Sequence, residues 1–122
     1  MPKLTDKIKE TIAEVRPGMV ATVGTDGRPN VSAKGSLRVL DDDHLAFADI
    51  SSPRTVANLK ANPAISVLVV HPKSMKGCRI WGRAEVMDSG ELFDTMAAEY
   101  ADRDIKVNHV ISITVEEASE SF

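Results

Sequence analysis

The sequence predicts a mainly β fold, a small antiparallel barrel of six strands with about three short helices. Short segments in which apolar and polar residues alternate recur along the chain, which is the pattern of half-buried strands. Turn-forming residues, such as Asp26-Gly27 and Asp41 to Asp43, separate consecutive strands. Helices do not alternate with strands throughout, as a doubly wound sheet would require.

The first part of the chain reads as a helix followed by a hairpin. The 122 residues fit one domain, residues 1–122. A helix is expected to begin after Thr5, its N-cap, and to end at Pro17-Gly18. Met19 to Val23 is then a short apolar strand, and Asp26-Gly27 suits a tight turn into the next strand.

The segment from Val31 to Val39 alternates strictly and predicts one strand. Such a strand has an apolar edge and an edge of hydroxyls and cations. Arg38 on the polar edge is expected to pair with Asp41 or Asp49. The next strand is expected to run from His44 to about Ala48. The apolar parity comprises Val31, Ala33, Gly35, Leu37 and Val39, and the polar parity comprises Ser32, Lys34, Ser36 and Arg38.

The next stretch, Ser51 to Thr55, is typical of a helix entrance. Ser52 is expected as N-cap and Pro53 as the first helical residue. The start of a helix exposes unpaired N–H groups and the positive end of the macrodipole. Arg54, Thr55 and the serines therefore favour a bound anion, most naturally a phosphate. We expect this entrance and the cationic strand edge to hold one phosphorylated cofactor between them.

The remaining elements are a short helix, three strands and a third helix. The short helix ends near Asn62, because Pro63 disfavours a helical residue before it. Ala64 to Val70 resembles a strand buried on both faces. The other expected segments are a long half-buried strand from Cys78 to Met87, a helix after Ser89-Gly90 and a strand from Val107 to Val115.

Composition and charge exclude several classes of function. The net charge is −3, acids and bases are mixed, and five aromatic residues are too few for a base-stacking surface, so no nucleic-acid partner is expected. No apolar run is long enough to span a membrane, and the N-terminal residues do not read as a secretory signal. With Cys78 as the only cysteine, we expect a cytoplasmic protein.

Metal and nucleophile chemistry find little support. His44, His71 and His109 lack metal-ligand spacing, so no metal site is expected. His109 is expected to be a hydrogen-bonded interior or interface histidine. Cys78 is expected to be a small buried hydrophobe rather than a nucleophile.

Two stretches, Asn30 to Leu40 and Phe47 to Leu59 with Asn62-Pro63 behind it, resemble the pyridoxamine-phosphate oxidase-like, FMN-binding split barrels. The later Trp81 to Glu85 strand fits the same pattern. The resemblance covers roughly residues 5 to 116, and its most specific part is the Ser-Pro-Arg-Thr helix entrance after two strands. It therefore implies a split β-barrel with six antiparallel strands.

The resemblance also implies a homodimer with one FMN at each end of the subunit interface. By the family pattern, Ser32, Ala33, Lys34 and Gly35 lie along the isoalloxazine and ribityl chain. Ile50, Ser51 and Ser52 flank the ribityl-phosphate, and Arg54 and Thr55 hold the phosphate. A cation such as Lys34 near the pyrimidine side would stabilise the reduced, anionic flavin.

Three functions remain open at this point. The chain lacks the longer C-terminal substrate-binding segment of the oxidase proper, so we favour a flavin-carrying oxidoreductase or electron-transfer protein, with no catalytic side chain assigned. The alternative is a non-catalytic module that carries or senses a phosphorylated cofactor such as a flavin, or haem. A third reading is a barrel scaffold for protein contacts.

Phe122, at the end of an acidic tail, is a candidate to reach the other subunit's cofactor.

Overall fold

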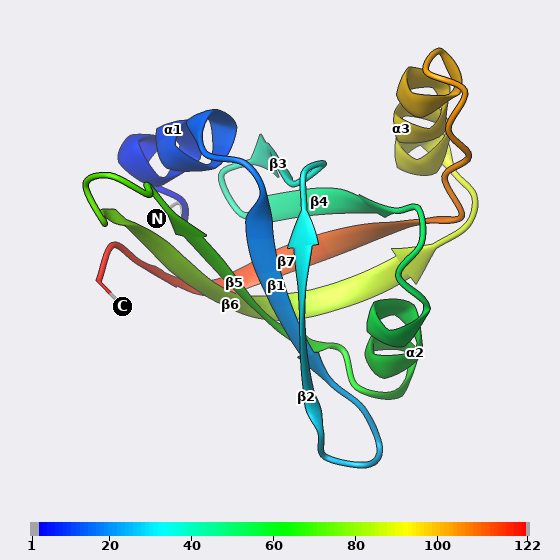
Figure 1. The fold of residues 1–122 in the computed structure, drawn as a ribbon, viewed down its shortest axis with the longest axis horizontal. Helices are drawn as coiled ribbons and strands as arrows, with labels where there is room; N and C mark the ends of the chain where they lie inside the picture. Colours follow the sequence, from blue (N-terminus) through cyan, green and yellow to red (C-terminus); the bar gives the residue numbers. More distant parts are fainter. Residues whose placement is uncertain (1–2, 122) are drawn as a thin grey trace.

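The computed structural model describes residues 3–121, which form one curled antiparallel sheet and three helices (Figure 1). Seven strands lie in the order β2-β1-β5-β6-β7-β4-β3. The helices are α1 (Asp6–Glu14), α2 (Pro53–Ala61) and α3 (Glu91–Ala101). The strands are β1 (Gly18–Val23), β2 (Pro29–Lys34), β3 (Arg38–Asp41), β4 (His44–Asp49), β5 (Ala64–Val70), β6 (Gly77–Met87) and β7 (His109–Ser119).

The mainly β fold and the three helices are confirmed, but the expected strand from Val31 to Val39 is two strands. The chain turns at Gly35-Ser36, so β2 and β3 lie at opposite edges of the sheet. Leu37 follows the turn, is 3% exposed and belongs to the core. The turn breaks the strand without breaking the alternation of residue types, which explains why the structure has seven strands and the prediction six.

The inward face of β2 is also the reverse of the one that hydrophobicity suggests. Val31 is 66% exposed, whereas Lys34 is buried. Ser32 and Lys34 instead turn towards the first residues of α2, where hydroxyl groups are their hydrogen-bond partners. The apolar parity of β2 therefore forms part of the outer surface.

The core lies inside the curl of the sheet, and helices close its ends. In Figure 1, α1 lies at one end of the curl, and α2 and α3 lie at the other. Apolar side chains of α1 and α2 pack into the main core around Phe47, whereas Met96 of α3 belongs to a smaller cluster beside β4 and β7. This arrangement places the start of α2 and the end of α3 on either side of the carboxyl end of β4.

Local signals at the helix ends and strands are largely confirmed. Thr5 caps α1, because its Oγ1 accepts the Ile8 N–H at 3.2 Å. α2 ends at Asn62 as expected. The last strand begins at His109 instead of Val107. β5 has the predicted bounds but is buried on one face only, since Leu68 is 36% exposed.

The helices and the C-terminal residue bear on two further expectations. Among residues 3–121, none of the helices combines the length and the hydropathy that crossing a membrane requires. The expectation for Phe122 lies outside the described residues.

Candidate functional site

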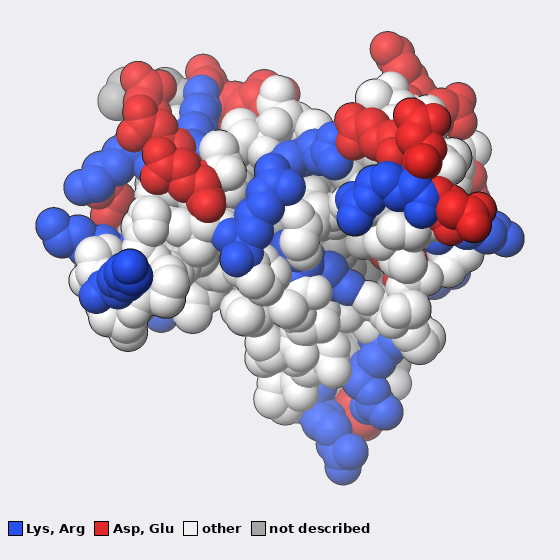
Figure 2. Space-filling view, turned by 45° about the horizontal axis from the view of Figure 1, so that its top comes forward, with Lys and Arg blue, Asp and Glu red and all other residues white. Residues whose placement is uncertain are grey.

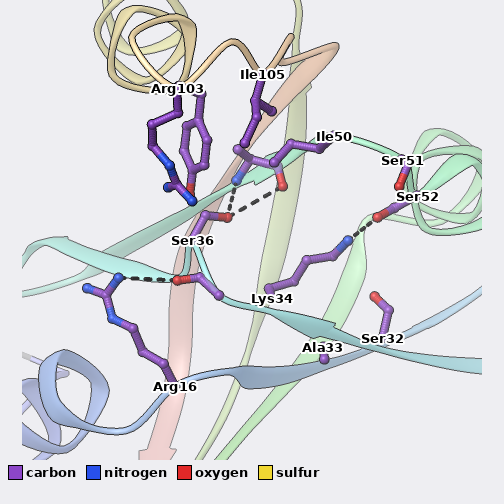
Figure 3. Close-up of a pocket in the computed structure, with 13 residues that line it drawn as sticks. Arg16, Ser32, Ala33, Lys34, Ser36, Ile50, Ser51, Ser52, Arg103 and Ile105 are labelled. Carbon is purple, nitrogen blue, oxygen red and sulfur yellow. Dashed lines mark hydrogen bonds between the residues drawn. The ribbon is translucent and has the colours of Figure 1, made fainter.

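A pocket of about 590 Å³ opens between β2, the start of α2 and the end of α3 (Figure 3). Its floor is the end of β2 with the turn that follows, and one wall is the loop from Ile50 to Ser52 between β4 and α2. The opposite wall comes from the connection between α3 and β7. The lining residues are Arg16, Ser32, Ala33, Lys34, Gly35, Ser36, Ala48, Ile50, Ser51, Ser52, Tyr100, Arg103 and Ile105.

The fold brings most of the sequence-predicted site residues into this pocket. Those that line it are Ser32, Ala33, Lys34, Gly35, Ile50, Ser51 and Ser52. Arg54 and Thr55, the expected phosphate ligands, lie in the first turn of α2 beyond the lining. The structure thus joins the strand edge to the loop that starts α2, as the sequence suggested, and leaves the two phosphate candidates beside the pocket.

Lys34 is the buried cation of the site. Its Nζ donates a hydrogen bond to Ser52 Oγ, as Figure 3 shows, and lies 5.7 Å from the centre of the Phe47 ring. The salt bridges formed within residues 3–121 do not include Lys34. Burial lowers the pKa of Lys34 below its ordinary value, and the negative charge of Asp49 opposes this effect. An ammonium in this position is available to an anionic or electron-rich ligand.

Ser52 precedes α2 as expected but does not cap it with its side chain. Its Oγ contacts Lys34, and its N–H donates to Asp49 Oδ1 at 2.7 Å. Pro53 occupies the start of the helix, where its missing N–H costs nothing. The first N–H groups of α2 therefore depend on groups other than the Ser52 hydroxyl.

Thr55 links α2 to β2. Its side chain is buried, and Oγ1 lies 3.2 Å from Ser32 Oγ and accepts a hydrogen bond from Asn30 Nδ2 at 3.4 Å. Arg54, one residue earlier, is exposed, and its side chain makes no hydrogen bond or ion pair to any of residues 3–121. A hydroxyl cluster and an uncommitted guanidinium thus lie together at the helix start.

The sequence did not predict the wall from the α3–β7 connection or the contribution of Arg16. Arg16 Nη1 donates to the Gly35 carbonyl oxygen in the floor at 3.2 Å, and the Arg103 guanidinium in the wall lies 5.2 Å from the centre of the Tyr100 ring. In Figure 3, Arg103 and Ile105 descend towards Ser36 from the α3–β7 connection. No motif marks these residues, because they reach the pocket from both ends of the chain.

Arg38 has a partner that the sequence did not suggest. Its Nη1 lies 2.8 Å from Glu99 Oε2, whereas Asp41 or Asp49 was expected. Asp41 instead accepts from His44 Nδ1 at 2.8 Å. The expectation was wrong because α3, far away in sequence, packs over the end of the sheet and supplies the nearer carboxylate.

The surface charge around the pocket is mixed. Figure 2 shows acidic side chains gathered over α1 and α3 at the two upper ends of one face, with basic side chains between them. Arg16, Lys34 and Arg103 all line the pocket, and none of the acidic residues between positions 3 and 121 does. The pocket is therefore suited to a ligand with negative charge.

Neither a reactive thiol nor a cluster of metal-binding side chains is found among the described residues. Cys78 is buried, and burial raises the pKa of its thiol to about 11, so it is not a reactive thiolate at neutral pH. Within residues 3–121, acidic, histidine and cysteine side chains do not gather into a group that would hold a metal ion. Redox chemistry at this site would need a bound cofactor.

Comparison with known proteins finds relatives in sequence and in structure. The chain is 30% identical over 106 residues to the uncharacterized protein MJ0282 of Methanocaldococcus jannaschii, covering 85% of this chain and 68% of that protein. Among solved structures, HupZ of Group A Streptococcus is 28% identical, with a TM-score of 0.89, 97% of this chain covered and 95% of that chain.

Two more distant structures share the fold. An FMN-binding protein from Syntrophomonas wolfei is 18% identical with a TM-score of 0.79, covering 95% of this chain and 89% of that one. The heme storage protein HutZ from Vibrio cholerae is 21% identical with a TM-score of 0.69, covering 97% of this chain and 94% of that one.

The sequence profile of the family described as pyridoxamine 5'-phosphate oxidase matches residues 4–122. The chain therefore belongs to the pyridoxamine 5'-phosphate oxidase family, and its curled sheet is the split barrel of that family.

Proposed function

We propose that the protein binds FMN in the 590 Å³ pocket and serves as an oxidoreductase that passes electrons through this cofactor. The observation that carries the proposal is the buried Lys34 ammonium, which has no carboxylate partner in the described chain and faces a pocket beside a helix start. Burying a charge without a partner is costly, so such a group is best explained by an anionic or electron-rich ligand.

The chain's own residues fit the parts of FMN. Ser32 to Gly35 would lie along the isoalloxazine and ribityl chain, and Ile50 to Ser52 would flank the ribityl-phosphate. Arg54, Thr55 and the first N–H groups of α2 would hold the phosphate, because guanidinium, hydroxyl and amide donors match a dianion. FMN supplies the electron-transfer chemistry, and the protein supplies binding and charge.

Arg54→Ala is expected to weaken FMN binding by about 1.5 kcal/mol, roughly tenfold, the lower end for a charge-assisted hydrogen bond, because the guanidinium is exposed. Calorimetric titration with FMN and with riboflavin, which lacks the phosphate, measures the effect. Only FMN affinity should fall. Lys60→Ala, an exposed cation in the last turn of the same helix, is the control. Equal loss for both ligands would contradict a phosphate role for Arg54.

The proposal includes a homodimer whose interface is the outer face of β2, β1 and β5. Val31, Met19 and Leu68 are 66%, 40% and 36% exposed on these neighbouring strands, around an apolar groove of about 320 Å³. Arg79, the register partner of Leu68, has a buried Nε–H without an acceptor within residues 3–121. A second copy would cover the apolar residues and supply that acceptor.

This interface would also border the cofactor pocket. Ala33 lines the pocket and pairs with Met19 in the β1–β2 ladder, so the two surfaces meet at the end of β2. A second copy docked on the outer face would therefore close one side of the pocket. That geometry supports FMN bound at the dimer interface.

Val31→Asp is expected to convert the dimer into a monomer, because it places a charge in the centre of the apolar face. The molar mass measured by light scattering after gel filtration should fall from that of two 13.2 kDa chains to that of one. Met75→Asp is the matched control, since Met75 is 65% exposed on a loop outside this face. A Val31→Asp protein that stays dimeric while folded would rule out this interface.

A visible absorbance spectrum tests the main proposal. Purified protein, as isolated or after incubation with FMN, should show bound-flavin absorbance, and NADH or NADPH should bleach it if a nicotinamide is the electron donor. Bleaching by a reduced redox protein alone would identify an electron-transfer role. Protein that binds no flavin under any of these conditions would refute the proposal.

A second candidate is a non-catalytic module that carries or senses a phosphorylated cofactor or haem in the same pocket. It is favoured by the shared fold with HutZ, which is named as a heme storage protein, although the identity of 21% shows the fold alone. Titration with haem in competition with FMN separates the two ligands. Bound flavin that no donor reduces would support the carrier role over the oxidoreductase.

A further inference from the structure

A buried carboxylate joins two strand ends to the loop that lines the pocket. Asp49 and His109 are register partners at the end of the β4–β7 ladder. Asp49 Oδ2 accepts a hydrogen bond from His109 Nδ1 at 2.8 Å, and Oδ1 accepts from the Ser52 N–H at 2.7 Å. The Asp49 side chain is only 5% exposed. The carboxylate thus uses one oxygen for the histidine and the other for the loop.

Asn108 adds a second connection between the loop and β7. Its Nδ2 donates to the Ile50 carbonyl oxygen at 2.8 Å, and its backbone N–H donates to the Asp49 carbonyl oxygen at 2.9 Å. The loop from Ile50 to Ser52 is therefore held at its first residue by Asn108, just before β7, and at its last residue by Asp49, the end of β4.

The loop is a wall shared by two cavities. Ser51 and Ser52 line the 590 Å³ pocket and also a second cavity of about 610 Å³. Lys34 lines the first cavity, and His109 lines the second. Asp49 and the Ile50–Ser52 loop therefore lie between His109 and the proposed cofactor site.

Charges on both sides act on the same carboxylate. Ser52 connects Lys34 to Asp49, because its Oγ accepts a hydrogen bond from Lys34 Nζ and its N–H donates to Asp49 Oδ1. The negative charge of Asp49 also opposes the effect of burial on the pKa of Lys34. Protonation of His109 adds a positive charge beside Asp49 Oδ2. Among the described residues, Lys60 and Lys106 are the lysines that line the second cavity together with Asp49 and His109. Interactions between buried charges are strong because the local dielectric constant is low.

We propose that Asp49 and His109 form a positioning pair that holds the Ile50–Ser52 loop against the cofactor and conveys the protonation of His109 to it through Asp49 and Lys34. This inference rests on the proposed binding of FMN and adds a means of regulation. Added positive charge stabilises a reduced, anionic flavin. The reduction potential of bound FMN should therefore rise when His109 gains a proton.

The test compares His109→Asn with His109→Ala. An asparagine amide N–H lies near the position of Nδ1 and keeps the hydrogen bond to Asp49, but it does not titrate. The midpoint potential of bound FMN is measured between about pH 5 and pH 8, the range in which histidine titrates. Beyond the pH dependence that the flavin has by itself, wild type should show an inflection that His109→Asn lacks, and the two proteins should bind FMN with similar affinity. His109→Ala should bind FMN about tenfold more weakly, because the loop loses an anchor.

The surface pair of His44 and Asp41 provides a matched control. The distance from His44 Nδ1 to Asp41 Oδ1 is also 2.8 Å, but this pair lies at the other end of β4 and lines neither cavity. His44→Asn should leave the inflection of wild type unchanged. Loss of the inflection in this variant would overturn the assignment to His109.

The failure of this inference is distinguishable from failure of the proposed function. If wild type binds FMN and His109→Asn keeps the inflection, the pair does not convey the charge, and the flavoprotein proposal stands. If wild type binds no flavin, NMR of the flavin-free protein decides. The Lys34 side-chain resonances should then shift as His109 titrates in wild type but not in His109→Asn, and the absence of that difference overturns the inference.

Discussion

Replacing Lys34 by methionine is expected to weaken FMN binding by about 1.5–3 kcal/mol, roughly 10- to 150-fold. Methionine keeps the apolar stem of the side chain and removes the ammonium, which is buried against Ser52 in the pocket. Calorimetric titration with FMN and riboflavin measures the loss. Both ligands should be affected, because Lys34 is assigned to the ring and ribityl part of the cofactor.

The pH dependence of binding checks that charge is the cause. Burial lowers the pKa of Lys34 from 10.5, so the ammonium loses its proton at a lower pH than a solvated lysine. FMN affinity of wild type should fall as the pH rises through this lowered pKa, and the affinity of Lys34→Met should not. An identical decline in both proteins would assign the pH effect to another group.

Stability provides an independent control with the opposite sign. Between the lowered pKa of Lys34 and 10.5, the unfolded chain binds more protons than the folded one, so this residue makes stability rise with pH. Below that window the folded state carries the full cost of the buried charge. Flavin-free Lys34→Met should consequently be at least as stable as wild type at neutral pH. Lower stability would contradict the cost assigned to the buried ammonium.

Phe47→Ala is expected to lower the free energy of unfolding by about 3–5 kcal/mol, the usual cost of removing a buried aromatic ring. Phe47 is 0% exposed, belongs to the main core and lies beneath Lys34. Since domains are commonly stable by about 5–15 kcal/mol, this loss takes a large share of the total. Urea unfolding followed by circular dichroism measures it.

Met75→Ala controls for the removal of an apolar side chain without a cavity. Met75 is 65% exposed, so its truncation should change stability by less than about 0.5 kcal/mol. A Phe47→Ala protein that unfolds at the urea concentration of wild type would show that Phe47 is not part of the packed core. Phe47→Leu should retain more stability, because it leaves a smaller cavity.

Local sequence patterns determined most of the elements. The Thr5 cap, the helix from Pro53 to Ala61 and the strand from Ala64 to Val70 all follow from side chains close in sequence. Capping, proline geometry and alternation are short-range effects, so a short window contains them. The same windows identified the two segments that border the pocket.

The sequence alone determined that β2 has two chemically different faces and that a helix with anion-binding character starts soon after β4. Only the tertiary structure decided that Lys34 faces inward and Val31 outward, that the chain turns at Gly35-Ser36, and that Arg103 completes the pocket. The physical reason is that alternation separates two faces without saying which one will be covered. The inner face of β2 is covered by the start of α2, whose position depends on the packing of the whole barrel.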